Sequence, residues 1–208
     1  MPGVVASAKV IERLVPPSRD DSTRDLKALF VSKSRTFSLA SFLLPKAQSD
    51  AVFRLYFVCR SLDDWADEGS ADKLNDSMEA WKQNQPHAIL DHYRFLQARW
   101  GLDNEPLTEL MQAMLREQEG VRIQSEEELL EYCYGVAGTI GLMLCPIFGT
   151  KDKEALEHAK NLGIAMQLTN ICRDVREDAE NDRIYLPASL FEGGIRVPGA
   201  IFYPPLIS

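Results

Sequence analysis

Apolar residues recur at helical spacing along most of this chain. Between Thr23 and about Leu190, apolar positions are separated mainly by three or four residues, the interval that places side chains on one face of an α-helix. Strand-like alternation of apolar and polar positions is rare, and no strand–helix–strand succession occurs. The pattern predicts an all-α domain over residues 23–192.

The two ends of the chain depart from this pattern. Residues 1–22 are interrupted by Pro16 and Pro17, which predicts an irregular N-terminal leader. This leader also lacks a continuous apolar stretch, so no secretory signal is expected. Residues 193–208 contain glycine, proline and aromatic side chains, with Arg196 as their only charge. Such a tail is compatible with a docking segment or with an altered reading frame.

Local signals predict where two of the helices begin. Ser49 and Asp50 are candidate caps for the helix that leads to Asp63. Ser125 and Glu128 have the spacing of a capping box and precede an apolar run. Both signals place an apolar helix directly after a polar start.

The apolar run after Ser125 is rich in glycine. Gly135, Gly138 and Gly141 each cost roughly 1 kcal/mol relative to alanine in a helix, so they require a structural reason. Close helix packing and room for a bulky apolar ligand are the alternatives, and no Gly-Lys-Ser/Thr sequence follows that would indicate a phosphate loop. Tyr132 and Tyr134 flank this run, and each is either a core residue or a proton donor or acceptor.

The overall composition limits the function classes. The chain has 208 residues, of which 45% are hydrophobic, and it carries a net charge of −8 with a pI near 5.0. This acidic balance argues against a nucleic-acid-binding protein, which would present a basic face. No run approaches the roughly 20 apolar residues of a membrane span. Residues 136–148 are therefore predicted to be a core helix.

Cysteine and histidine spacing gives no metal-site motif. No CxxC pair occurs, and the histidines show no zinc spacing with the cysteines. The cysteines lie in apolar helical stretches and are predicted to be buried, reduced thiols. The residues concerned are Cys59, Cys133, Cys145, Cys172, His87, His92 and His158.

The first candidate site is an acidic stripe at the end of an apolar helix. Tyr56, Arg60, Asp63 and Asp67 follow one another at intervals of four, three and four residues, so they share one helical face. Acidic residues alone would suggest a solvated helix end, but the basic and phenolic groups on the same face favour a site. Arg60 is either an anion clamp for phosphate oxygens or the partner of Asp63 or Asp64 in an intrahelical ion pair.

A second stripe occurs within a long helix predicted over residues 151–179. Gln167, Asn170, Asp174 and Asp178 are spaced by three, four and four residues. Buried amides need hydrogen-bond partners or a wet cavity, so a core hydrogen-bond network is one explanation. Three oxygen ligands on one helical face favour the other explanation, a metal site.

Both stripes grow out of apolar runs, at residues 51–62 and 162–172, so two buried helices are expected to aim carboxylates at one cavity. Such carboxylates repel one another unless cations neutralise them. Oxygen ligands suit Mg²⁺, or Mn²⁺ in its place, and Mg²⁺ in turn suits phosphate. Arg173 is a candidate diphosphate contact, whereas Arg176 is expected to face solvent. The sequence therefore points to a diphosphate substrate.

Four ordered motifs together resemble those of the squalene/phytoene synthase family. They comprise a serine-rich N-terminal segment, two Asp-rich motifs and a central helix, and the resemblance runs from about Thr23 to about Val197. The matching segments are residues 34–38 with Pro45, residues 56–67, residues 132–141, and residues 167–178 with residues 183–187.

The resemblance implies the isoprenoid-synthase fold, with antiparallel helices around a central cavity. It implies head-to-head condensation of two prenyl diphosphates, with release of diphosphate, through a cyclopropylcarbinyl diphosphate. Mg²⁺ ligands would be Asp63, Asp67, Asn170, Asp174 and Asp178, and the catalytic residues would be these four aspartates with Tyr132 as the base. Substrate-binding residues would be Thr36, Phe37, Tyr56, Arg60, Gln167, Arg173 and Tyr185.

Within the family, residues 167–174 and 183–187 look more like bacterial and plastid phytoene synthases than like eukaryotic squalene synthases. Condensation of two geranylgeranyl diphosphates to phytoene is therefore expected. Squalene or dehydrosqualene formation from farnesyl diphosphate is the alternative, and NADPH is implied only for squalene.

The family continues with further helices after the segment that matches Leu190, whereas this chain continues with the atypical tail. A non-catalytic homologue with an assembly or scaffold role, or an inactive truncated form, is therefore a further alternative. The expected location is cytoplasmic, with peripheral membrane contact because the products are very apolar. A plastid location stays open.

Overall fold

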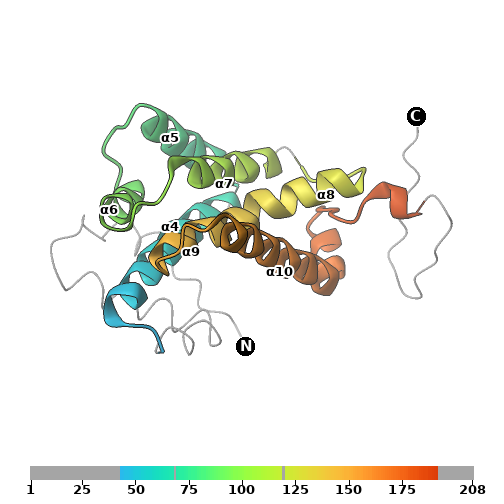
Figure 1. Cartoon of the computed structure of the whole chain (residues 1–208). Coiled ribbons are helices and arrows are strands. Elements are labelled where there is room, and N and C mark those ends of the chain that lie inside the picture. Colours follow the sequence, from blue (N-terminus) through green and yellow to red (C-terminus); the bar gives the residue numbers. More distant parts are fainter. Residues whose placement is uncertain (1–42, 68, 119, 192–208) are drawn as a thin grey trace, which may run out of the picture.

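The computed structural model describes residues 43–67, 69–118 and 120–191, which form a helical assembly (Figure 1). Among these residues the one β pairing is an isolated parallel bridge between Arg122 and Ile184. The all-α prediction is confirmed, and the predicted leader and tail lie outside the described residues. The elements are α4 (Lys46–Asp67), α5 (Ala71–Lys82), α6 (Leu90–Trp100), α7 (Asn104–Glu117), α8 (Glu126–Cys133), the π-helical turn η1 (Tyr134–Gly138), α9 (Thr139–Ile147), α10 (Lys153–Glu180) and the 3-10 turn η2 (Ala188–Phe191).

Helix α4 runs through the main core. Leu55, Val58 and Leu62, on successive turns, are almost fully buried, and α4 packs against α5, α6, α7 and α9. It begins at Lys46, directly after Pro45, so the predicted start at Ser49 was wrong by about one turn. The fixed φ of proline suits the start of a helix, which explains the earlier beginning.

The capping box before α8 is present in a modified form. The Ser125 hydroxyl accepts a hydrogen bond from the backbone N–H of Glu128 at 3.2 Å. The Glu128 carboxylate in turn accepts from the N–H of Gln124 at 2.8 Å, one residue before the usual partner. The predicted helix start is thus confirmed.

Helices α8, η1 and α9 run end to end as one long segment (Figure 1). In the described part of the chain, Glu126–Ile147 is the single stretch with the length and apolar composition to cross a membrane, and 39% of its apolar window is buried. The segment packs against both α7 and α10, as expected of a core helix. It begins at the capping box and ends near Pro146, as the apolar run after Ser125 predicted, and the π-helical turn continues α8 into α9.

Two glycines bring α10 against this central segment. A Cβ atom on Gly141 would lie 2.3 Å from the carbonyl oxygen of Ala159, and one on Gly163 would lie 2.4 Å from that of Ala137. Real Cβ atoms do not approach so closely, so any side chain at either position would force the helices apart. Close helix packing, one of the two explanations for the glycine pattern, is therefore confirmed at Gly141.

Helix α10 is long but weakly buried. Of its residues only Ile171 is buried, while Leu162 is 63% exposed and Met166 is 44% exposed. The prediction that residues 162–172 form a buried run was therefore wrong. Helix α10 packs on α8, η1 and α9, while its apolar residues Leu162 and Met166 stay exposed.

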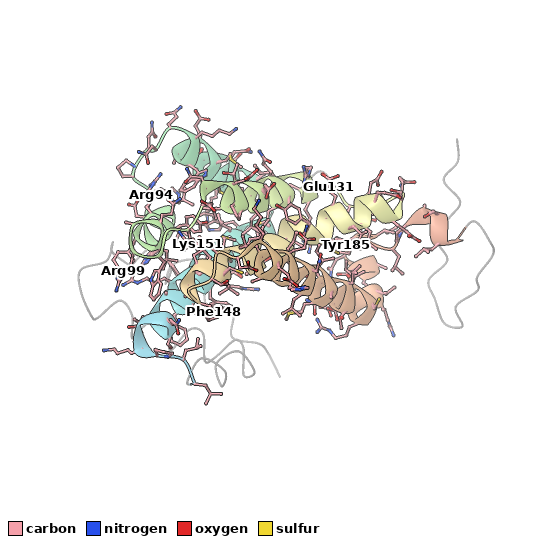
Figure 2. The ribbon with its side chains drawn as sticks, viewed as in Figure 1. Arg94, Arg99, Glu131, Phe148, Lys151 and Tyr185 are labelled. Carbon is pink, nitrogen blue, oxygen red and sulfur yellow. The ribbon has the colours of Figure 1, made fainter. Side chains whose placement is uncertain are left out.

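An exposed apolar side chain also occurs beside α10. Phe148, in the turn between α9 and α10, lies at the surface, as does the charged Lys151 of the same turn (Figure 2). The cysteine prediction holds for Cys59, Cys133 and Cys145 but was wrong for Cys172, which is exposed on α10.

Candidate active site

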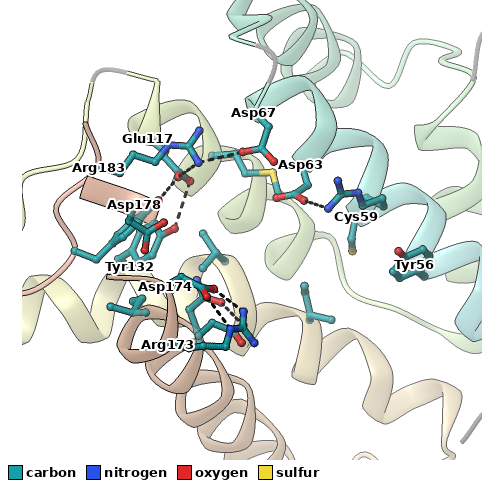
Figure 3. A pocket seen from close by; sticks show the side chains of 18 residues that line it. Tyr56, Cys59, Asp63, Asp67, Glu117, Tyr132, Arg173, Asp174, Asp178 and Arg183 are labelled. Atoms are coloured by element: carbon teal, nitrogen blue, oxygen red, sulfur yellow. Dashed lines mark hydrogen bonds and ion pairs between the residues drawn. The ribbon is translucent and has the colours of Figure 1, made fainter. Parts of the chain in front are cut away.

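A cavity of about 410 Å³ lies between α4 and α10 (Figure 3). Its volume falls in the range usual for small-molecule sites. Charged and amide groups line one part of its wall, and apolar groups from α4, α7, α9, α10 and η1 line another. The lining residues are Tyr56, Cys59, Arg60, Asp63, Asp67, Met114, Glu117, Tyr132, Val136, Ile140, Gln167, Asn170, Ile171, Arg173, Asp174, Asp178, Arg183 and Tyr185.

Both predicted stripes line this cavity, one from each side. Each contributes all four of its residues, and Tyr132, Arg173 and Tyr185 line the cavity with them. Helical spacing explains this result, because residues three or four apart share one face. Thr36 and Phe37 lie outside the described residues. The structure thus gathers every predicted site residue that it describes, while the roles given to these residues stay predictions.

Arg183 and Tyr185 reach the cavity through a short parallel pairing. The backbone N–H of Ile184 donates to the carbonyl of Val121 at 3.0 Å, and the N–H of Ile123 donates to the carbonyl of Ile184 at 3.2 Å. This pairing fixes the segment after α10 beside the segment after α7. The residues on either side of Ile184 therefore both line the cavity.

Arginines neutralise the carboxylates of α4. Arg60 contacts Asp63 at 2.8 Å and Asp64 at 2.6 Å, and Arg183 contacts Asp67 at 3.1 Å. The intrahelical ion pair considered for Arg60 is therefore present. The expectation that added cations must neutralise these carboxylates was too strong, because the guanidinium groups of Arg60 and Arg183 already neutralise part of their charge.

The two carboxylates of the α10 stripe have pKa values that are shifted in opposite directions. Arg173 donates to Asp174 at 2.7 Å, and this hydrogen bond lowers the pKa of Asp174. Burial, with the nearby charge of Asp174, raises the pKa of Asp178 against the effect of Arg183. Arg176 is exposed and pairs with Glu180 of its own helix, as expected of a residue that faces solvent.

Asp63 is strongly perturbed. Partial burial raises its pKa to about 6, Arg60 opposes this effect, and the negative charges of Asp67, Asp64 and Glu117 add to it. An unperturbed aspartate titrates near pH 4. The position therefore carries unfavourable negative charge at neutral pH, which a bound cation would relieve.

The donor set suits Mg²⁺ that is bound together with a substrate. Among the described residues, no three carboxylate, imidazole or thiol side chains form a group that could hold a metal ion. Mg²⁺ usually takes one or two protein carboxylates and completes its shell with water and substrate phosphates. Oxygen-bearing side chains on two facing helices fit that mode, and the residues that would hold the ion are Asp63, Asp67, Asn170, Asp174 and Asp178.

The structure distinguishes the two tyrosines of the central segment. Tyr132 lines the cavity, and its hydroxyl donates to Glu117 at 3.4 Å. Tyr134 is not among the cavity residues, and its hydroxyl instead donates to Glu109 of α7. Tyr132 is therefore the tyrosine placed to contact a substrate.

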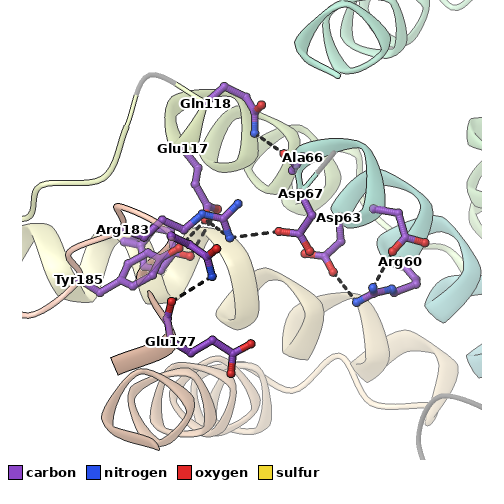
Figure 4. A network of polar contacts seen from close by, with 12 residues as sticks. Arg60, Asp63, Ala66, Asp67, Glu117, Gln118, Glu177, Arg183 and Tyr185 are labelled. Carbon is purple, nitrogen blue, oxygen red and sulfur yellow. Dashed lines mark hydrogen bonds and ion pairs between the residues drawn. The ribbon is translucent and has the colours of Figure 1, made fainter. Parts of the chain in front are cut away.

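Sequence reasoning missed Glu117, at the C-terminal end of α7. Its carboxylate accepts from Tyr132 and Tyr185 and lies 3.7 Å from Arg183, which also contacts Asp67 (Figure 4). One signal could have identified it, because Glu117 continues the stripe of the buried residues Leu110 and Met114 on α7. An acidic residue on an apolar stripe requires a partner or a function.

Comparison with known proteins assigns the chain to a family. The family model for squalene/phytoene synthase matches residues 30–199, so the chain belongs to the squalene/phytoene synthase family. A phytoene synthase of Thermus thermophilus is 37% identical over 193 residues, which cover 88% of this chain and 65% of that protein. A 4,4′-diapophytoene synthase of Staphylococcus haemolyticus is 36% identical over 163 residues, which cover 73% of this chain and 57% of that protein.

Solved structures confirm the fold. A dehydrosqualene synthase in complex with ligand aligns with a TM-score of 0.71 at 29% identity, covering 80% of this chain and 61% of that one. The squalene synthase HpnC from Alicyclobacillus acidocaldarius aligns with a TM-score of 0.69 at 25% identity, covering 80% of this chain and 66% of that one. The predicted isoprenoid-synthase fold is thus confirmed. The chain spans between 57% and 66% of the length of these four relatives.

Proposed function

We propose that this protein condenses two prenyl diphosphates head to head and releases diphosphate. The observation that carries the proposal is the placement of two oxygen-bearing stripes, on α4 and α10, on one cavity that also has apolar walls. Membership of the squalene/phytoene synthase family supports the same reaction class.

The polar part of the cavity would hold the diphosphate. The five oxygen-bearing residues named above would hold Mg²⁺, which would supply charge neutralisation for the diphosphate. Arg173, whose side chain is 67% exposed, can turn toward phosphate oxygens. Arg60 lines the cavity, so its guanidinium can contact an anion bound there.

The apolar part of the cavity would hold the prenyl chains. Met114, Val136, Ile140 and Ile171 line it, and such walls exclude water from an allylic cation. The double bond of the second chain would attack this cation, and Tyr132 would accept the proton lost as the cyclopropane closes. Tyr56 and Gln167 would line the cavity beside the chains, and Tyr185 would help to hold the diphosphate.

Geranylgeranyl diphosphate is the preferred substrate and phytoene the preferred product. The 37% identity to a phytoene synthase favours this choice. Farnesyl diphosphate is the second candidate, because a 4,4′-diapophytoene synthase is 36% identical and a dehydrosqualene synthase shares the fold. NADPH would be needed only for squalene.

Product analysis tests the proposal. The full chain is incubated with Mg²⁺ and either geranylgeranyl or farnesyl diphosphate, with and without NADPH, and the extracts are separated by chromatography. Phytoene from geranylgeranyl diphosphate is expected, with no product when EDTA removes the metal. Dehydrosqualene or squalene from farnesyl diphosphate alone would instead establish the second candidate.

Ligand variants show whether any product arises in this cavity. Asp63→Asn and Asp174→Asn are each expected to lower kcat by roughly 10²–10³-fold, since each removes charge that holds the metal and the diphosphate. Asp76→Asn, an exposed carboxylate on α5, is the matched control and should leave turnover unchanged. Full turnover in both site variants would refute the assigned roles.

A further inference from the structure

Glu117 and Tyr132 form a partition between two cavities. A second cavity of about 270 Å³ lies beyond the first, and these two residues line both. The other residues of the second cavity belong to the end of α7, to the segment that follows it, and to α8. They are Ala113, Arg116, Gly120, Val121, Arg122, Ile123, Glu128 and Glu131.

Glu117 is well placed to hold the tyrosine hydroxyl. Its side chain is only 12% exposed, and its carboxylate accepts hydrogen bonds from both Tyr132 and Tyr185. The rings of these tyrosines lie 4.8 Å apart between centroids, so they support each other. Arg183 lies 3.7 Å from the same carboxylate and forms an ion pair with it.

A proton arriving at Tyr132 needs a further acceptor. Burial and the charge of Glu117 raise the pKa of Tyr132 above its ordinary value, so the side chain is a neutral phenol at neutral pH. A neutral phenol is a very weak base unless it loses its own proton as it gains another. In the described part of the chain, the acceptor of the Tyr132 hydroxyl proton is the Glu117 carboxylate.

We propose that Glu117 is a positioning residue that receives the Tyr132 hydroxyl proton, with the second cavity as the exit to solvent. The inference rests on the proposed condensation. As the cyclopropane closes, the substrate C–H bond breaks and its electron pair forms the new C–C bond. The released proton binds the Tyr132 oxygen, the original hydroxyl proton moves to Glu117 Oε2, and neutral Tyr132 is restored.

The protonated Glu117 would then return its proton to water in the second cavity. This route leads away from the prenyl chains, so the cation is not exposed to water. The 3.4 Å contact between Tyr132 and Glu117 is long for an O–H···O bond. Catalytic hydrogen bonds are often long without substrate and shorten in the loaded enzyme.

The test compares two glutamates on α7 that each accept from a tyrosine. Glu117→Gln keeps the size of the side chain but cannot take the proton, and kcat should fall about 10²–10⁴-fold. Glu109→Gln makes the same change at the matching bond from Tyr134, at a residue outside both cavities, and should retain turnover. The Kd of a non-reactive thio-diphosphate analogue and the thermal midpoint should stay close to wild type in Glu117→Gln.

Chemical rescue separates proton acceptance from packing. Formate supplied to Glu117→Ala should enter the second cavity and restore part of kcat, whereas equal concentrations of chloride or formamide should not. The double variant Tyr132→Phe with Glu117→Gln should be no slower than the slower single variant, since both changes interrupt one step.

The outcomes distinguish the two proposals. A folded wild-type chain that forms no prenyl product would refute the condensation and this inference with it. An active wild type with a fully active Glu117→Gln would overturn the role of Glu117 alone. A parallel loss of kcat, analogue affinity and thermal midpoint in Glu117→Gln, without formate rescue of Glu117→Ala, would show a merely structural role.

Discussion

The two helices that carry the acidic stripes are held very differently. Helix α4 buries side chains on successive turns against four other helices, whereas α10, although longer, buries only Ile171. Both present polar side chains, three or four residues apart, to the same cavity. The comparison shows that a helix can present a stripe of polar side chains to a cavity from one face alone. The rest of the helix can be deeply buried, as in α4, or largely exposed, as in α10.

The anchorage of α10 depends on a few close contacts. Gly141 and Gly163 place its backbone directly against the central segment. A small apolar cluster around Ile171 and Cys133 adds to this, and the pairing of Ile184 with the segment after α7 fixes the end of the helix. The α10 side of the cavity should therefore be the more easily displaced.

A matched pair of leucines gives the strongest test of the difference in burial between α4 and α10. Leu62 on α4 is fully buried, so Leu62→Ala should cost about 2–5 kcal/mol of unfolding free energy. Leu162 on α10 is 63% exposed, so Leu162→Ala should change the stability by less than about 0.5 kcal/mol. Urea unfolding measures both values, and equal losses would contradict the described exposure of α10.

A second prediction concerns the glycine contact. Gly163→Ala should cost about 1–3 kcal/mol, because its methyl group would meet the Ala137 carbonyl. A fall of roughly 2–4 °C in the thermal midpoint is expected for each kcal/mol in a chain of this size. Asn161→Ala, at an exposed position of the same helix, serves as the control. A stable Gly163→Ala protein would show that the helices do not cross at this point.

The smallest predicted effects are changes in thermal stability when one aspartate of each stripe is replaced, and the signs are opposite for α4 and α10. The raised pKa of Asp63 means that its contribution to stability is present below about pH 4 and is lost as the pH rises through about 6. Without metal, Asp63→Asn should therefore raise the thermal midpoint at pH 7 by about 1–2 °C, a small effect because the side chain is half-exposed.

Asp174 should behave in the opposite way. Its pKa is lowered by the hydrogen bond from Arg173, so its contribution is present above the ordinary pKa of an aspartate and is lost as the pH falls. Asp174→Asn should slightly lower the midpoint at pH 7 and have no effect in acid. Calorimetry from pH 3 to 8 measures both variants, and shifts of the same sign would contradict the charge environments described for α4 and α10.

Much of the site could be predicted from the sequence, because helical spacing alone determines which residues share a face. Tyr56 with Asp67, and Gln167 with Asp178, therefore reach one cavity as expected. The burial of α10 could not be predicted, since an apolar run does not reveal which of its faces another element covers. The contacts of Glu117 and Gly163 could not be predicted, because they join segments distant in sequence, although the stripe on α7 does mark Glu117 as a candidate.

The pairing of arginines with the site carboxylates has a consequence for the order of ligand loading. Asp63, Asp67 and Asp174 already have guanidinium partners, so Mg²⁺ bound at the proposed site would compete with these arginines for the carboxylates. Each arginine released in this way would gain unpaired positive charge beside the incoming phosphate. Metal and diphosphate should consequently enhance each other's affinity, and each alone should bind weakly.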